Sequence, residues 1–110
     1  MDIIQNEAKC SGFKFIAKDE SKKEVGRAFL YVMHNELHTQ PFGFMEDVYI
    51  DEEMRGQGLG TSLVKEVINK AKELGCYKLV ATSRYSRSKV HDLYIKLGFL
   101  DHGKEFRIDF

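Results

Sequence analysis

The strongest hydrophobic pattern in the chain is a helical one in its second half. Beyond residue 60, apolar side chains recur every three or four positions and the positions between them are polar or charged, as in an amphipathic helix. Gly75 predicts the end of this helix, because glycine readily adopts the left-handed conformation found just past helix C-termini. The apolar stripe consists of Leu63, Val64, Val67, Ile68, Ala71 and Leu74.

Strand-like segments surround this helix. Alternation over residues 13–17 predicts a strand, and the polar residues 18–24 predict a turn into a second strand at 25–33. The second strand is continuously apolar over most of its length, so we expect it to be covered on both faces. Three further strands are expected at 45–50, 77–83 and 105–110, the last half-buried and antiparallel, with a weak edge strand at 3–4 and a second helix that buries Val90, Leu93, Tyr94 and Leu97 before Gly98.

The order of these elements, ββ, β, α, β, α, β, predicts a single α/β (α+β) domain over residues 1–110. The strands on either side of the first helix would be parallel, because a helix joins them through a right-handed crossover. The remaining strands would be antiparallel. We therefore expect a mixed, mostly antiparallel sheet with a central parallel pair and helices packed on it.

A glycine-rich loop lies between the expected strand 45–50 and the first helix. It reads Arg55-Gly56-Gln57-Gly58-Leu59-Gly60. Backbone N–H groups in such a loop and in the first helical turn have no intrahelical partner, and the helix dipole adds partial positive charge there. Glycines let a phosphate approach the backbone, and Arg55 adds a permanent cation. The loop therefore predicts a phosphate-binding site.

The spacing of the glycines argues against two common nucleotide loops. A Walker A loop needs Gly-Lys-Ser/Thr, whereas Gly60 is followed directly by Thr61. The dinucleotide fingerprint needs G-x-G-x-x-G, whereas Gly56, Gly58 and Gly60 form G-x-G-x-G, and the next strand carries Lys78 in place of a ribose-binding acid. S-adenosylmethionine enzymes also use G-x-G-x-G, usually on a longer sheet, and remain an alternative.

Two segments resemble motifs of the GCN5-related N-acetyltransferase (GNAT) superfamily. The first is Glu46-Asp47-Val48-Tyr49-Ile50 followed by Arg55, Gly58 and Gly60 in the spacing Arg-x-x-Gly-x-Gly. The second, Leu93-Tyr94-Ile95-Lys96-Leu97-Gly98-Phe99, resembles the "LYxKLGF" segment of that family. The two motifs occur in the family's order, and the resemblance covers residues 25–110.

The resemblance implies acetyl-CoA as co-substrate and a V-shaped splay between strand 45–50 and its parallel neighbour. In the family, the loop amides hold the coenzyme A pyrophosphate and the splayed strand pairs with the pantetheine arm. Arg87 stands where many members carry Asn, so that contact is either lost or replaced by a phosphate contact. The cofactor contacts implied for this chain are Val48, Tyr49, Ile50, Arg55, Gly56, Gln57, Gly58, Leu59, Gly60, Thr61 and Arg87.

Tyr94 and Glu46 are the candidate catalytic residues. Tyr94 matches the tyrosine that donates a hydrogen bond or proton to the coenzyme sulfur in many members; its alternative role is a core residue on the apolar stripe of its helix. An amine nucleophile with a pKa near ~10 must lose a proton. Glu46 is the favoured base, directly or through water, with Asp47 or solvent as alternatives. The two carboxylates would point to opposite faces unless a bulge intervenes.

One feature departs from the family pattern. Two helices normally lie between the first two strands and help to wall the acceptor site, whereas only about seven polar residues occupy that gap here. We therefore expect a compact form of the fold whose acceptor side is open or completed by a second subunit. A homodimer would also cover the apolar surface left by the short chain.

Composition narrows the classes of partner. The chain has 17 Lys and Arg against 17 Asp and Glu, so it offers no excess basic charge for nucleic acid or an anionic membrane. No apolar run reaches the ~20 residues of a membrane helix and no signal-peptide pattern is present, so we expect a cytoplasmic protein. Cys10 and Cys76 are expected to be reduced thiols. His34 and His38 lie in a polar loop without a third ligand, so no metal site is expected.

These observations predict an N-acetyltransferase that moves an acetyl group from acetyl-CoA to a primary amine of a small molecule or peptide. Direct attack is favoured, because the sequence offers no activated Cys or Ser for a ping-pong route. The alternative is a non-catalytic module that binds acetyl-CoA or coenzyme A. Nothing in the sequence identifies the acceptor.

Overall fold

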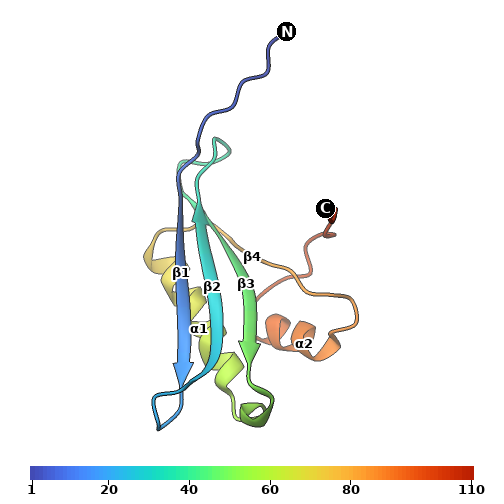
Figure 1. Ribbon diagram of the computed structural model, residues 1–110. Coiled ribbons are helices and arrows are strands. Elements are labelled where there is room, and N and C mark those ends of the chain that lie inside the picture. Colours follow the sequence, from blue (N-terminus) through green and yellow to red (C-terminus); the bar gives the residue numbers. More distant parts are fainter.

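A computed structural model describes all residues, 1–110, and shows a four-stranded sheet with two α-helices (Figure 1). The strands run in the order β1-β2-β3-β4 across the sheet. A short 3₁₀ turn, η1 (Glu52–Met54), separates β3 from α1. The elements are β1 (Cys10–Lys18), β2 (Glu24–Met33), β3 (Phe42–Ile50), α1 (Leu59–Glu73), β4 (Leu79–Ala81) and α2 (Ser88–Lys96).

The pairing of the strands confirms the mixed sheet. β1 and β2 form an antiparallel hairpin around a polar turn, and β2 pairs antiparallel with β3. β3 and β4 are parallel, as the crossover through α1 requires. No helix lies between β1 and β2, in agreement with the short polar gap in the sequence.

β4 is much shorter than the strand expected at 77–83. It pairs with β3 only from Gly43 opposite Leu79 to Met45 opposite Ala81, after which the two strands separate. Residues 46–50 of β3 therefore have no partner in β4. This separation is the predicted V-shaped splay, and in Figure 1 the chain that leaves β4 runs away from β3 towards α2.

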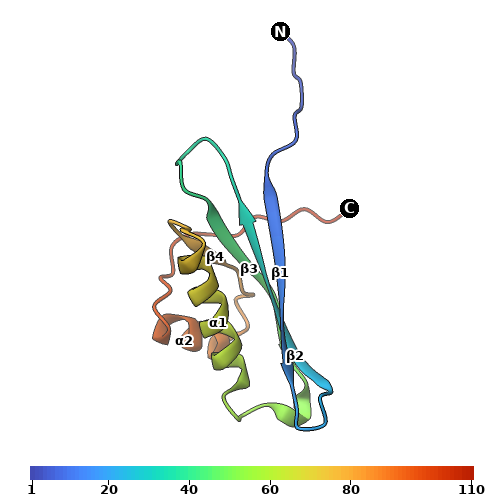
Figure 2. The same ribbon diagram turned by 90° about the vertical axis from the view of Figure 1, so that its left-hand side faces the viewer.

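The core lies between α1 and one face of the sheet. Figure 2 shows both helices on the same side of strands β1–β3. The alternate residues of β2 that face α1 are fully or almost fully buried, and the stripe of α1 predicted from the sequence meets them. The core cluster consists of Ala28, Leu30, Val32 and Met45 from the sheet and Leu63, Val64, Val67 and Ala71 from α1.

The expectation that β2 is covered on both faces is wrong. Phe29 is half-buried and Tyr31 exposed on the face opposite α1, where Figure 2 shows no helix. Their rings lie 6.1 Å apart and nearly parallel, and the ammonium of Lys14 approaches Phe29 from β1. The two rings stack on one another and the Lys14 ammonium lies 6.0 Å from the Phe29 ring centre, so a continuous apolar sequence here does not require a second layer.

Neither terminal strand prediction is confirmed. Residues 3–4 belong to no strand, and the N-terminal segment extends away from the sheet (Figure 1). Residues 105–110 alternate in sequence, but no backbone hydrogen bond holds residues 100–110. Their apolar side chains are exposed. Alternation alone therefore does not produce a strand where no neighbouring strand accepts the ladder.

Both helices end as predicted, at glycines in the left-handed conformation. Gly75 has φ 77° and Gly98 has φ 104°. In α2, the Gly98 N–H donates to Ile95 and the Phe99 N–H donates to Tyr94, which is the pattern of a Schellman cap. Such caps commonly include an apolar contact between their first and last residues. In this cap those residues are Tyr94 and Phe99, whose rings lie 5.2 Å apart.

Candidate functional site

The glycine loop leaves backbone N–H groups at the N-terminus of α1 without a partner in the helix. Gly56 and Gly58 both have φ 82°, a left-handed conformation that other residues adopt only with strain. The first intrahelical hydrogen bond of α1 runs from the Ser62 N–H to the Gly58 carbonyl. The N–H groups of residues 59–61 precede that bond and therefore have no partner within the helix. The loop thus has the geometry predicted for holding a phosphate.

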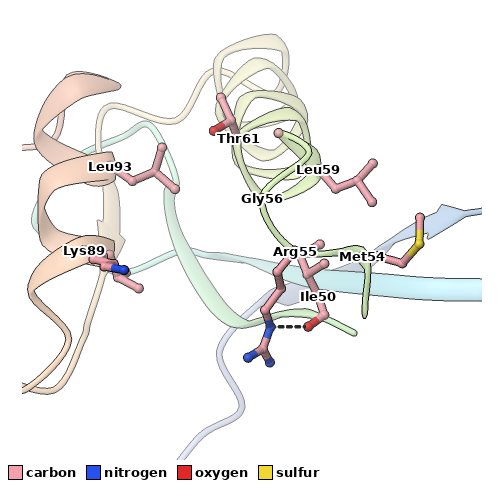
Figure 3. A pocket seen from close by; sticks show the side chains of 11 residues that line it. Ile50, Met54, Arg55, Gly56, Leu59, Thr61, Lys89 and Leu93 are labelled. Carbon is pink, nitrogen blue, oxygen red and sulfur yellow. Dashed lines mark hydrogen bonds between the residues drawn. The ribbon is translucent and has the colours of Figure 1, made fainter. Parts of the chain in front are cut away.

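A cavity of about 390 Å³ opens in front of this helix end. Figure 3 shows its walls: the end of β3 and the loop on one side, α1 behind, and α2 opposite. Lys89 and Leu93 reach into the cavity from α2, so its wall combines a cation with apolar side chains. The lining residues are Ile50, Met54, Arg55, Gly56, Gly58, Leu59, Gly60, Thr61, Lys89, Val90 and Leu93.

Arg55 is anchored at the mouth of this cavity. Its Nε donates a 2.8 Å hydrogen bond to the Ile50 carbonyl oxygen (Figure 3), and its guanidinium lies 5.5 Å from the centre of the Tyr49 ring. Only one of its five N–H groups is used in this hydrogen bond. The side chain is thus held in place by the strand while the remaining N–H groups stay available to an anion.

β3 contains a bulge beside the cavity. Glu46 lies opposite Phe29 and Tyr49 lies opposite Arg27, so two residues of β3 face a single residue of β2 between these pairs. Asp47 has φ 52° within the bulge. Strict alternation would place the side chains of Glu46 and Asp47 on opposite faces of the sheet. Because of the bulge, both side chains are instead exposed to solvent.

Glu46 lies apart from the cavity, at the edge of a second hollow of about 650 Å³. Phe44 and Glu46 of β3 and Thr82, just past β4, form its floor where the two strands separate. Residues 105–108 of the C-terminal segment form the rest of its lining. The splay therefore has the main cavity at its wide end and this second hollow at its narrow end.

Tyr94 faces the core side of α2. It packs against the core cluster and against Phe99, and it is not among the residues that line the main cavity, although Val90 and Leu93 of the same helix are. Burial raises the pKa of its phenol, and the nearby Arg87 guanidinium acts in the opposite direction. The phenol therefore stays protonated at neutral pH and can donate a hydrogen bond.

This arrangement of strands and helices recurs in known proteins. The sequence profile of the Acetyltransferase (GNAT) family matches residues 2–99. The chain belongs to this family.

Three relatives illustrate the range of this GNAT family. The chain is 37% identical over 67 residues to glucosamine 6-phosphate N-acetyltransferase of Trypanosoma brucei brucei, covering 61% of this chain and 44% of that protein. It is 28% identical over 101 residues to aminoglycoside N(6')-acetyltransferase type 1 of Stenotrophomonas maltophilia, covering 89% of this chain and 66% of that protein. A crystal structure of a Trypanosoma brucei acetyltransferase superposes with a TM-score of 0.79 at 27% identity, covering 90% of this chain and 69% of the other. The chain thus spans less than two thirds of the length of both curated relatives.

The structure brings together most, but not all, of the cofactor residues predicted for this GNAT chain. Seven of them line the main cavity: Ile50, Arg55, Gly56, Gly58, Leu59, Gly60 and Thr61. Val48, Tyr49, Gln57 and Arg87 do not line it. Val48 packs against the core instead, and Tyr49 contacts the guanidinium of Arg55. The contact of all eleven residues with the cofactor remains a prediction.

Four lining residues are not among the cofactor contacts predicted from the sequence: Met54, Lys89, Val90 and Leu93. Val90 and Leu93 were assigned to the core because they belong to the apolar stripe of α2. That stripe is only partly covered by the sheet and α1, and none of its residues is fully buried. The apolar stripe of α2 was the signal in the sequence. Only the structure shows that this stripe lines a cavity, because α2 does not pack tightly on the sheet.

The structure bears on three further features considered in the sequence: Cys76, metal ligands and membrane-spanning segments. Burial raises the pKa of the Cys76 thiol, so this cysteine stays protonated and is a poor nucleophile. No group of three His, Cys, Asp or Glu residues is arranged to hold a metal ion. None of the helices combines the length and apolar character needed to cross a membrane.

Proposed function

We propose that this GNAT-family chain binds acetyl-CoA and transfers its acetyl group to a primary amine. The observation that carries the proposal is the row of N–H groups before the Ser62–Gly58 hydrogen bond, which opens into a cavity beside the unpaired end of β3. The residues present fit coenzyme A. The loop and helix end suit a pyrophosphate, and the apolar wall formed by Val90 and Leu93 suits a pantetheine arm.

The two cations at the cavity would complete the phosphate site. Arg55 and Lys89 lie on opposite walls (Figure 3), so an anion between them could contact both. Arg55 can offer planar paired donors and Lys89 a single flexible ammonium. We assign Lys89 to the phosphates of coenzyme A on this basis, together with the predicted contact from Arg87 at the start of α2.

The unpaired part of β3 would orient the thioester that acetyl-CoA supplies. The Asp51 N–H donates to the Val25 carbonyl of β2, and successive strand residues direct their backbone groups to opposite sides. The Ile50 N–H therefore points away from β2, towards the gap left by β4. In this position a backbone donor can stabilise negative charge on the carbonyl oxygen during acyl transfer.

Transfer then requires two proton movements. The amine nitrogen bonds to the acetyl carbon, the carbon–sulfur bond breaks, and the electron pair leaves with the sulfur. We assign the amine proton to Glu46, directly or through water, and the proton given to the sulfur to Tyr94. The raised pKa of Tyr94 supports this role because the phenol carries its proton at neutral pH.

The second hollow is the proposed entrance for the acceptor. Glu46 and Glu105 contribute carboxylates to its lining, and the one cation there, Arg107, is already paired with Asp109, so the lining suits a protonated amine before it loses its proton. Two of the relatives named above are enzymes for amine-bearing sugars, a sugar phosphate and an aminoglycoside. A small polar amine is accordingly the acceptor class to screen first, with peptide amines as the second class.

The oligomeric state and location belong to the same proposal. Phe106 and Ile108 are 90% and 76% exposed on the unanchored C-terminal segment, and a second subunit would cover them. Sedimentation of the wild type and of a Phe106→Ser variant tests the homodimer. Two free cysteines fit a reducing cytoplasmic location, which cell fractionation tests.

A ligand panel followed by an acceptor screen tests the function. Acetyl-CoA and coenzyme A should raise the melting midpoint, whereas S-adenosylmethionine, NAD and ATP should not. Thiol release with amine acceptors then separates an enzyme from a binding module: Tyr94→Phe and Glu46→Gln should lower turnover while keeping affinity for coenzyme A. Affinity for coenzyme A without thiol release from any acceptor would favour the non-catalytic alternative.

A further inference from the structure

The bulge in β3 changes which residues face the core. Before it, Met45 points towards α1 and Glu46 points away. Without an extra residue, strict alternation would turn Val48 away from the core. Instead Val48 and Ile50 both pack against the core cluster, and Tyr49 is exposed. The single additional residue therefore sets the orientation of all of β3 beyond it.

The bulge also coincides with the start of the splay. The last pair between β3 and β4 is Met45 with Ala81, and Asp47 adopts its left-handed conformation two residues later. Bulges bend a strand and increase its local twist. The conformation of Asp47 thus accompanies the departure of β3 from β4 and the placement of Ile50 on the cavity wall.

Arg27 contacts the bulge on both sides. Its Nε and Nη2 donate to the two carboxylate oxygens of Asp47 at 2.8 and 3.1 Å. Its guanidinium also lies 4.9 Å from the centre of the Tyr49 ring, and Arg55 lies near the same ring. A chain of contacts therefore runs from Asp47 through Arg27, Tyr49 and Arg55 to the carbonyl oxygen of Ile50.

We infer that Arg27 is a positioning residue that holds Asp47 in its left-handed conformation and thereby fixes the end of β3 that faces the cofactor cavity. The consequence for coenzyme A binding rests on the proposed function. The effect on β3 itself does not, because it follows from the contacts of Arg27 alone.

The conformation of Asp47 explains why a clamp is useful. A residue with a Cβ atom is disfavoured at positive φ, and Asp tolerates that region better than most without preferring it. Glycine occupies it at no steric cost. A glycine at position 47 should therefore keep the bulge without help from Arg27. The inference therefore predicts that Arg27 becomes unnecessary once residue 47 is glycine.

A double-mutant cycle tests it. Arg27→Met should weaken coenzyme A binding about tenfold by calorimetry, because Asp47 without Arg27 would leave its disfavoured left-handed conformation more often. It should also speed hydrogen exchange of the Asp51 N–H, which donates to β2 just beyond the bulge. Asp47→Gly should stay within about threefold of the wild type in affinity, and Arg27→Met combined with Asp47→Gly should match Asp47→Gly alone.

Lys14→Met is the matched control. The Lys14–Glu24 pair spans 2.8 Å on the hairpin and is about as exposed as the Arg27–Asp47 pair, but Lys14 makes no salt bridge or hydrogen bond with Asp47. Loss of the Lys14–Glu24 pair should leave the affinity for coenzyme A and the hydrogen exchange of the Asp51 N–H unchanged. If Arg27→Met fails to fold, Arg27→Lys, which keeps the positive charge but not the planar paired donors, should show an exchange rate between those of wild type and Asp47→Ala.

Two results would overturn the inference. One is a double variant as impaired as Arg27→Met, which would show that Arg27 acts otherwise than through the conformation of residue 47. The other is an equal effect from Lys14→Met, which would reduce Arg27 to a general surface pair. A wild type that binds no coenzyme A would refute the proposed function, while hydrogen exchange of Asp51 would still decide whether the clamp exists.

Discussion

Replacing Gly60 should separate cofactor binding from folding. Gly60 is the second residue of α1, and its φ is not left-handed, unlike that of Gly56 and Gly58. A Cβ atom added there would meet only Ile50 Cγ1, at 3.9 Å, which is ordinary contact. Gly60→Ala should therefore leave the fold intact and stabilise it by up to about 1 kcal/mol, the helix preference of alanine over glycine.

A leucine at the same position should keep the fold but fill the cavity. Leucine is nearly as good a helix former as alanine, and Gly60 lines the cavity directly. We expect Gly60→Leu to melt at or above the wild-type temperature and to bind coenzyme A at least about tenfold more weakly.

Thermal shift measures both properties in one experiment. Coenzyme A at a hundred times the wild-type dissociation constant contributes about 2.7 kcal/mol of stability, and only about 1.4 kcal/mol after a tenfold loss of affinity. The ligand-induced rise in melting temperature should therefore fall by about half in Gly60→Leu. Gly60→Ala, the matched control, should keep most of the rise. A full rise in Gly60→Leu would refute the placement of the phosphates at this helix end.

Three further predictions follow from other contacts. Gly58→Ala, at φ 82°, should cost about 1–2 kcal/mol and lower the melting temperature by several degrees, and an unchanged midpoint would contradict the strain argument. Tyr94→Phe keeps the ring contact with Phe99, so it should lower turnover at an unchanged melting temperature; a large loss of stability would instead support a core role. The Arg27 hydrogen bond lowers the pKa of Asp47, so the stabilising contribution of this pair is complete above the ordinary carboxyl pKa of ~3.9 and is lost as pH falls through the lower folded value. The stability difference between wild type and Arg27→Met should accordingly be constant from about pH 7 to 5 and shrink below about pH 4, and a difference that persists to pH 2 in urea unfolding would exclude the pair as its cause.

Local sequence determined the parts of this protein whose physics is local. The stripe of α1, its end at Gly75 and the hairpin of β1 and β2 follow from side-chain periodicity and turn residues. The prediction of an anion site follows from glycines before a helix, because N–H groups at a helix start have no partner within the helix. These features, and the family motifs that contain them, were sufficient to predict the mixed sheet and the phosphate loop.

Tertiary structure decided the features that depend on a neighbour. Residues 105–110 have the alternation of a strand, but no strand edge accepts them, and β2 is covered on one face because its outer aromatic rings cover each other. Tyr94 turns towards Phe99 because the helix cap brings the two together. The orientation of Glu46 depends on a bulge that only the pairing with β2 reveals. Each of these outcomes depends on which neighbours the folded chain supplies to a side chain or backbone group, and periodicity alone does not show those neighbours.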